Sequence, residues 1–149
     1  MQLLILRHGH ADAGSPDQSR QLSVYGREQV RKQMLRHHRD ISATQVVLSS
    51  PYVRTAQTAE IITQATAAPS IQWSDDLVPN GSLRQVEALL QQYQASNVLL
   101  VSHLPLVGLL IDYLTGETAT SMGTASLASL SMDYPAQGTA TLHWNHYVD

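Results

Sequence analysis

Three short aliphatic runs, separated by longer stretches of helical pattern, constrain the fold of this chain most. The first run is Leu3-Leu4-Ile5-Leu6, and residues 45–48 and 97–102 hold the other two. Short apolar runs of this kind are typical of strands that are covered on both faces, as in a parallel sheet. Each run stops abruptly at polar residues, which indicates where each strand ends.

Helix signals follow the first two runs. Ser23 is expected to cap a helix over 23–38, because serine at this position accepts a hydrogen bond from the first turn. Ser50 followed by Pro51 predicts the start of a second helix over 51–66, with the serine as its cap and the proline at its first position.

The rest of the chain continues the alternation. A short strand is expected over 71–73, and two more helices over 82–93 and 105–115. Weaker alternation over 126–133 and 138–144 predicts an antiparallel hairpin at the edge of the sheet. The whole pattern predicts an α/β fold in one domain, residues 1–149. We expect a three-layer α/β/α sandwich with a mostly parallel central sheet and an antiparallel C-terminal edge.

The composition narrows the class of protein. Nine basic and twelve acidic side chains give a formal net charge of -3, which argues against nucleic-acid binding because such domains usually carry a basic patch. The chain has no cysteine, so disulfides, thiolate metal sites and cysteine nucleophiles are excluded. The sequence predicts neither a signal peptide nor a membrane span. We therefore expect a cytoplasmic protein with no membrane partner.

Reactive side chains follow all three aliphatic runs. They are Arg7 and His8 after the first, Ser50 and then Arg54 after the second, and His103 after the third. If these strands are parallel neighbours, the side chains converge in the crevice where α/β sheets bind ligands. Arginine pairs with phosphate through two hydrogen bonds, and nearby cations keep a histidine neutral. Because a neutral imidazole can attack phosphorus, the site predicts phosphoryl transfer through a histidine.

These residues resemble the signatures of the histidine phosphatase superfamily, which includes the phosphoglycerate mutases. The matching segments are Leu6-Arg7-His8-Gly9, Ser49-Ser50-Pro51 with residues 54–59, and Ser102-His103. Segments 20–26, 102–108 and 123–126 resemble, more narrowly, the small bacterial SixA-type phosphohistidine phosphatases. The likeness covers nearly the whole chain and implies a phosphoglycerate mutase-like fold.

The resemblance also implies roles for individual residues. His8 would be the nucleophile that forms a transient phosphohistidine, while Arg7, Arg54 and His103 would hold the phosphoryl oxygens. Catalysis of this kind depends on positioning and electrostatics, and the motif requires no metal or cofactor. Three further residues are expected to bind the substrate: Arg20, Ser50 and Gly9.

One departure from the family pattern bears on the substrate. Mutase-like members present a glutamate as general acid before the third helix, where this chain reads Leu77-Val78-Pro79-Asn80-Gly81-Ser82. An imidazole leaving group needs a proton less than an alkoxide does, because protonated histidine has a pKa of about 6.5. The missing glutamate therefore favours a phosphohistidine substrate over a phosphate ester. Three carboxylates could still supply a proton: Asp12, Asp17 and Asp76.

The sequence thus predicts a phosphatase that acts on a histidine of a phosphotransfer or signalling protein, and that works as a monomer with an open crevice. A phosphatase of small phosphate esters and a catalytically idle phosphoprotein-binding module are the alternatives. A binuclear metal hydrolase is a weaker one. His8, His10 and Asp12 begin its His-x-His-x-Asp pattern, but Ala13 stands where that pattern needs a histidine.

Overall fold

The described part of the computed structural model, residues 1–148, contains one six-stranded sheet in the order β3-β2-β4-β1-β5-β6. The strands are β1 (Gln2–Arg7), β2 (Val46–Ser49), β3 (Ile71–Trp73), β4 (Asn97–Ser102), β5 (Leu127–Ser131) and β6 (Thr141–His146). The first four strands of that order run parallel, whereas β5 pairs antiparallel with both β1 and β6. The predicted sheet, mostly parallel with an antiparallel C-terminal edge, is confirmed.

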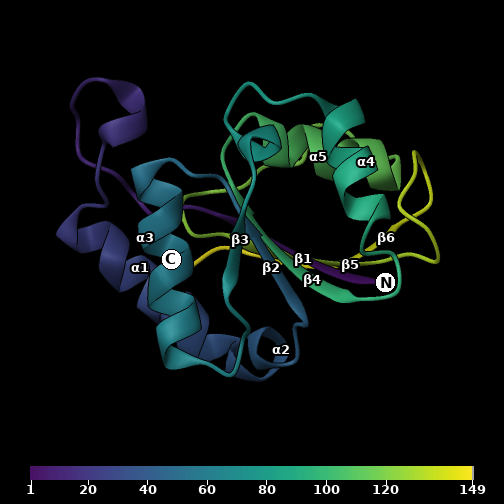
Figure 1. The fold of residues 1–149 in the computed structure, drawn as a ribbon, viewed down its shortest axis with the longest axis horizontal. Helices are drawn as coiled ribbons and strands as arrows, with labels where there is room; N and C mark the ends of the chain where they lie inside the picture. Colours follow the sequence, from purple (N-terminus) through teal and green to yellow (C-terminus); the bar gives the residue numbers. More distant parts are fainter. Residues whose placement is uncertain (149) are drawn as a thin grey trace.

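Helices cover both faces of this sheet (Figure 1). The first group is α1 (Val24–Arg36), α2 (His38–Ser42) and α3 (Val53–Ala65), and the second is α4 (Leu83–Gln91) and α5 (Leu106–Thr115). Two short 3-10 turns, η1 (Asp17–Ser19) and η2 (Asp75–Leu77), lie in the connecting loops. No helix among the described residues is both long and apolar enough to cross a membrane.

The first aliphatic run shows how the sequence produces these layers. Leu3 and Ile5 of β1 pack in the cluster that holds the apolar residues of α4 and α5. Leu4 and Leu6 pack instead with the apolar residues of α1, α2 and α3. Successive side chains of a strand point to opposite faces, so an unbroken aliphatic run requires cover on both faces. The predicted three-layer α/β/α sandwich is confirmed.

The start of α1 agrees with the sequence-based prediction. The Ser23 hydroxyl accepts a hydrogen bond from the Gly26 N–H at 2.9 Å, as a capping serine should. The far end differs, because α1 ends at Arg36 and the chain bends at His37 into the separate short helix α2.

The predicted start of α3 is wrong. The helix begins at Val53, and Tyr52 occupies the cap position without a side-chain capping bond. Ser50 still follows the strand register, since its N–H donates to the Val101 carbonyl of β4 at 3.1 Å. Parallel pairing therefore extends one residue beyond β2, and this pairing overrides the local helix signal of Ser50 and Pro51.

Two glycines let α1 lie directly against the segment that follows β1. A Cβ atom on Gly26 would overlap the His10 carbonyl oxygen, and one on Gly9 would lie 2.6 Å from the Gly26 carbonyl oxygen. No other residue type fits such a close approach of two backbones. This contact fixes the direction in which the chain leaves His8.

Candidate active site

The three parallel strands β1, β2 and β4 bring the predicted site residues to one edge of the sheet. Arg7 is in register with Ser102, and Ser49 with Val101, so His8, Ser50 and His103 follow their strands side by side. The His8 and His103 rings lie edge to face, with centroids 5.1 Å apart. The predicted convergence of these side chains is confirmed.

His8 presents one ring nitrogen for chemistry. Its Nδ1 lies 2.7 Å from the Gly9 carbonyl oxygen, which can only accept, so the proton is on Nδ1. The Nε2 atom carries the lone pair and accepts a hydrogen bond from Arg54 Nε at 3.3 Å. The buried ring is thus held in the tautomer that leaves Nε2 as a nucleophile.

Both histidines of the site are held neutral. Burial lowers the pKa of His8 to about 4, with a further contribution from Arg54, Arg7 and Arg20. Burial lowers the pKa of His103 to about 2, and His8 and Arg54 add to the effect. The sequence predicted a neutral imidazole because of neighbouring cations, whereas in the structure the loss of hydration on burial is the larger cause.

A backbone carbonyl positions Arg7, and an aromatic ring lies against Arg54. Arg7 Nη1 donates to the Met122 carbonyl at 2.9 Å, while its buried Nε has no partner within residues 1–148. Burial and the charge of Arg54 lower the pKa of Arg7. The Arg54 guanidinium lies over the Tyr52 ring, with its Cζ 5.3 Å from the ring centroid. An anion near His8 would therefore meet guanidinium groups from β1 and α3.

The Ser50 side chain is bonded to its neighbours in the site, and a direct contact with substrate remains a prediction. It is fully buried, and its Oγ lies 2.8 Å from His103 Nε2. The same Oγ accepts a hydrogen bond from the Tyr52 N–H at 3.3 Å. Ser50 therefore orients His103, and the Tyr52 ring packs edge-on against that histidine at 5.1 Å.

Both backbone polar groups of Gly9 already have hydrogen-bond partners, and binding of substrate by Gly9 remains a prediction. Its N–H donates to Thr58 Oγ1 at 3.2 Å, and its carbonyl is occupied by His8 Nδ1. Arg20 points at its own loop, donating to the Asp12 carbonyl at 2.9 Å and to the Asp17 carboxylate at 3.1 Å. A direct contact of Arg20 with substrate remains a prediction.

The three candidate proton donors differ in the ion pairs that their carboxylates form. Asp17 forms ion pairs with Arg54 and Arg20, each at 3.1 Å. Burial alone raises the pKa of Asp17, but the hydrogen bonds from Arg20 and Arg54 outweigh it and hold that pKa below its usual value. Asp17 is therefore ionised near neutral pH and is a poor acid, which argues against that prediction.

Asp12 and Asp76 make no such contacts. Asp12 is exposed and Asp76 is partly exposed. Within residues 1–148 no hydrogen bond or ion pair joins either carboxylate to His8, Arg54 or His103. Either aspartate as the proton donor remains a prediction.

The metal-hydrolase alternative gains no support from the geometry. His10 does not turn toward His8, since its Nδ1 lies 2.7 Å from Ser23 Oγ. Among the described residues no group of three or more histidine or acidic side chains is arranged to hold a metal ion.

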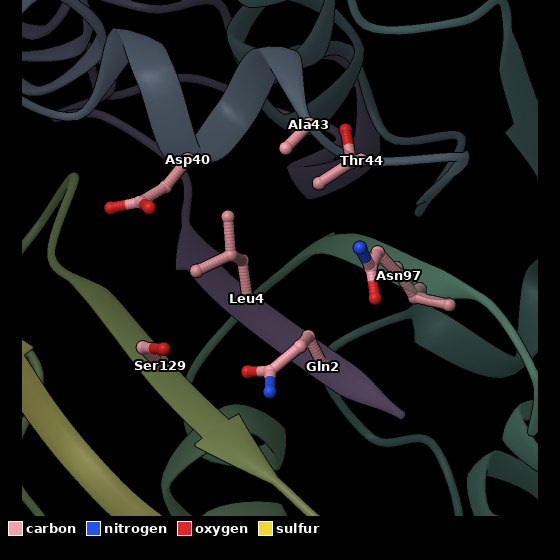
Figure 2. A pocket seen from close by; sticks show the side chains of 8 residues that line it. Gln2, Leu4, Asp40, Ala43, Thr44, Asn97 and Ser129 are labelled. Carbon is pink, nitrogen blue, oxygen red and sulfur yellow. The ribbon is translucent and has the colours of Figure 1, made fainter.

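A separate cavity of about 170 Å³ lies at the opposite end of the strands. Figure 2 shows Gln2 and Leu4 of β1 with Asp40 of α2 and Asn97 of β4 around it. Since β1 runs from Gln2 toward His8, this cavity and the histidine pair lie at opposite ends of β1. The cavity is therefore not part of the phosphoryl site.

Three contributors to the site escaped the sequence-based prediction: Tyr52, Thr58 and the Met122 carbonyl. Tyr52 lies between Pro51 and Arg54. An aromatic residue at this point, directly after Ser49-Ser50-Pro51, could have indicated a contact with the site. Thr58 lies one turn after Arg54 and accepts from Gly9, which the helical spacing could have indicated. The Met122 carbonyl comes from the loop before β5, and no local pattern indicates that contact.

The site combines a neutral histidine with an unprotonated Nε2, two arginines and a second histidine at the carboxyl edge of an α/β sandwich. This combination defines a class of phosphoryl-transfer enzymes. The family model of the histidine phosphatase superfamily (branch 1) matches residues 3–77. The chain belongs to this superfamily.

Within the superfamily the chain is similar to SixA proteins over nearly its full length. Phosphohistidine phosphatase SixA of Escherichia coli strain K12 is 35% identical over 151 residues, covering 97% of this chain and 92% of that protein. The SixA homolog of Haemophilus influenzae is 32% identical and covers 89% of each chain. The solved structure of the protein histidine phosphatase SixA complexed with tungstate is 32% identical. It has a TM-score of 0.92 and covers 99% of this chain and 97% of that one.

Proposed function

We propose that this enzyme removes the phosphoryl group from a phosphohistidine of a phosphotransfer protein, through a covalent intermediate on His8. The observation that carries this proposal is the Nε2 atom of His8, unprotonated and 3.3 Å from Arg54 Nε. The similar proteins named phosphohistidine phosphatase SixA support the class of substrate. The SixA structure that holds tungstate, a tetrahedral oxyanion like phosphate, supports an anion site in the relative.

The reaction proceeds in two transfers. His8 Nε2 attacks phosphorus, and the bond between phosphorus and the substrate imidazole breaks, with its electron pair leaving on the imidazole nitrogen. Arg7 and Arg54 stabilise the charge that develops on the phosphoryl oxygens. Water then attacks the phosphorus on His8, which releases inorganic phosphate and returns the lone pair to Nε2.

The leaving group makes a strong acid unnecessary. The carboxylate that pairs with Arg54, Asp17, is held ionised by Arg54 and Arg20, and no glutamate lies in the segment from Leu77 to Ser82. The phosphorylated ring can take up a proton on its second nitrogen near neutral pH, because a protonated histidine has a pKa of about 6.5, and it then leaves as neutral imidazole. A phosphate ester has no such basic site on its leaving group. The site is therefore better matched to phosphohistidine than to a phosphate ester.

The intermediate is tested by trapping. Wild-type enzyme mixed with a ³²P-labelled phosphohistidine protein and quenched in alkali should carry acid-labile label, and His8→Ala should carry none. His10→Ala is the matched control, since it removes the next histidine, whose ring bonds to Ser23. Label retained by His8→Ala would refute the assignment of the nucleophile.

The substrate class is tested by competition. The kcat/KM for a phosphohistidine protein should exceed that for small phosphate esters, and a hundredfold preference for an ester would overturn the protein substrate. We further propose that the enzyme acts as a single domain over residues 1–149, as a monomer, in the cytoplasm.

A further inference from the structure

In the loop between β1 and α1, the Asp17 carboxylate pairs with two arginines: Arg54 of the site and Arg20 of the same loop. Asp17 Oδ2 lies 3.1 Å from Arg54 Nη2, and Asp17 Oδ1 lies 3.1 Å from Arg20 Nη1. The Arg54 side chain is only 6% exposed, whereas that of Asp17 is 54% exposed. This loop projects beyond the sheet as the purple hook of Figure 1, and its turn η1 contacts α3.

Each nitrogen of the Arg54 side chain already donates a hydrogen bond to His8 or to Asp17. Its Nε donates to His8 Nε2, its Nη1 to the Asp17 carbonyl at 2.8 Å, and its Nη2 to the Asp17 carboxylate. A carboxylate and a phosphoryl group use the same paired geometry on a guanidinium. A phosphoryl group beside His8 therefore meets a guanidinium that already holds an anion.

We infer that Asp17 is a specificity-determining residue, because its carboxylate competes with the phosphoryl group for Arg54. This inference rests on the proposed function. Free phosphate and small esters bind almost entirely through their anionic group, so competition from the Asp17 carboxylate lowers their affinity directly. A protein that carries the phosphohistidine can contact the exposed Asp17 loop and draw the carboxylate away from Arg54, so the competition costs this substrate less. Asp17 thus favours the protein substrate and limits inhibition by the phosphate product.

A purely structural role for Asp17 predicts the opposite sign. If the carboxylate only held Arg54 in place, its removal would weaken anion binding. The Asp17 carbonyl continues to accept from Arg54 Nη1 in any side-chain variant, so the loop keeps one anchor on α3. The sign of the change in anion affinity therefore separates competition from positioning.

The binding test uses Asp17→Asn, which keeps the shape and removes the charge, and Asp17→Ala, which removes both. Asp133→Asn, at an exposed position between β5 and β6, is the control with the same change in net charge. Isothermal titration with inorganic phosphate and with tungstate should give about tenfold tighter binding for both Asp17 variants than for the control, as expected for a nearby, partly solvated charge. Equal or weaker binding by the Asp17 variants would overturn the inference.

A kinetic test separates this inference from the proposed function. Asp17→Asn should raise kcat/KM for p-nitrophenyl phosphate several-fold more than for a phosphohistidine protein, and an equal change for both would overturn the role in specificity. If wild-type enzyme prefers the small ester, the proposed substrate fails. The titrations with phosphate and tungstate still decide whether Asp17 competes for Arg54.

Discussion

The two buried histidines should make the stability of this protein fall steeply in mild acid. An unfolded histidine has a pKa of about 6.5, whereas the folded pKa is about 4 for His8 and about 2 for His103. Because the folded values are lower, the unfolded chain binds more protons below pH 6.5. The stabilising contribution is therefore complete above about pH 6.5 and is lost as the pH falls toward the folded pKa.

The magnitude follows from the linkage between protonation and folding. At about pH 5 the unfolded His8 is almost fully protonated, while the folded His8 is protonated roughly one time in ten. The free energy of unfolding thus loses about 2 kcal/mol through His8 between about pH 7.5 and about pH 5, and a similar amount through His103. His8→Asn should remove about half of this combined loss, because its one titrating group is gone.

The assay is urea unfolding followed by circular dichroism at several pH values. His143→Asn, at an exposed position of β6, controls for the general loss of an imidazole. A His8→Asn protein that loses as much stability as wild type between about pH 7.5 and about pH 5 would refute the reasoning. It would mean that folded His8 titrates near the value of an unfolded histidine, and an NMR titration of the His8 ring would show the same result.

Two further substitutions test how the site is built. Ser50→Ala removes the Oγ that lies 2.8 Å from His103 Nε2, so kcat/KM should fall about tenfold; undiminished activity would contradict the orienting role. The free energy of unfolding should also fall by about 1–3 kcal/mol, because the buried His103 nitrogen loses its partner. Gly26→Ala places a methyl group against the His10 carbonyl and should destabilise the fold by about 2 kcal/mol or more in urea titrations. Gly14→Ala is its matched control, since a Cβ there meets only the Arg20 side chain at an ordinary 3.7 Å; equal stability of the two variants would count against the close approach.

Much of the fold could be predicted because it depends on local pattern. The run Leu3-Leu4-Ile5-Leu6 predicted a strand buried on both faces, and the helices of the two layers cover those faces. Ser23 predicted the start of α1 through a bond within its own turn. The start of α3 was predicted wrongly because pairing of Ser50 with β4, a contact distant in sequence, prevailed over the local cap signal.

The sequence by itself determined that reactive residues follow three buried strands. It predicted that His8, Arg54 and His103 would meet at one edge of the sheet if these strands were parallel neighbours, and the order of the strands came from the structure. Only the tertiary structure decided which atom of each residue remains available. Ser50 turns inward to His103, and Asp17 returns from a loop to pair with Arg54. The physical reason is that periodicity along the chain specifies which face or end a residue occupies. Hydrogen-bond partners and the burial that lowers the pKa of His8 depend instead on segments that meet only after the chain has folded.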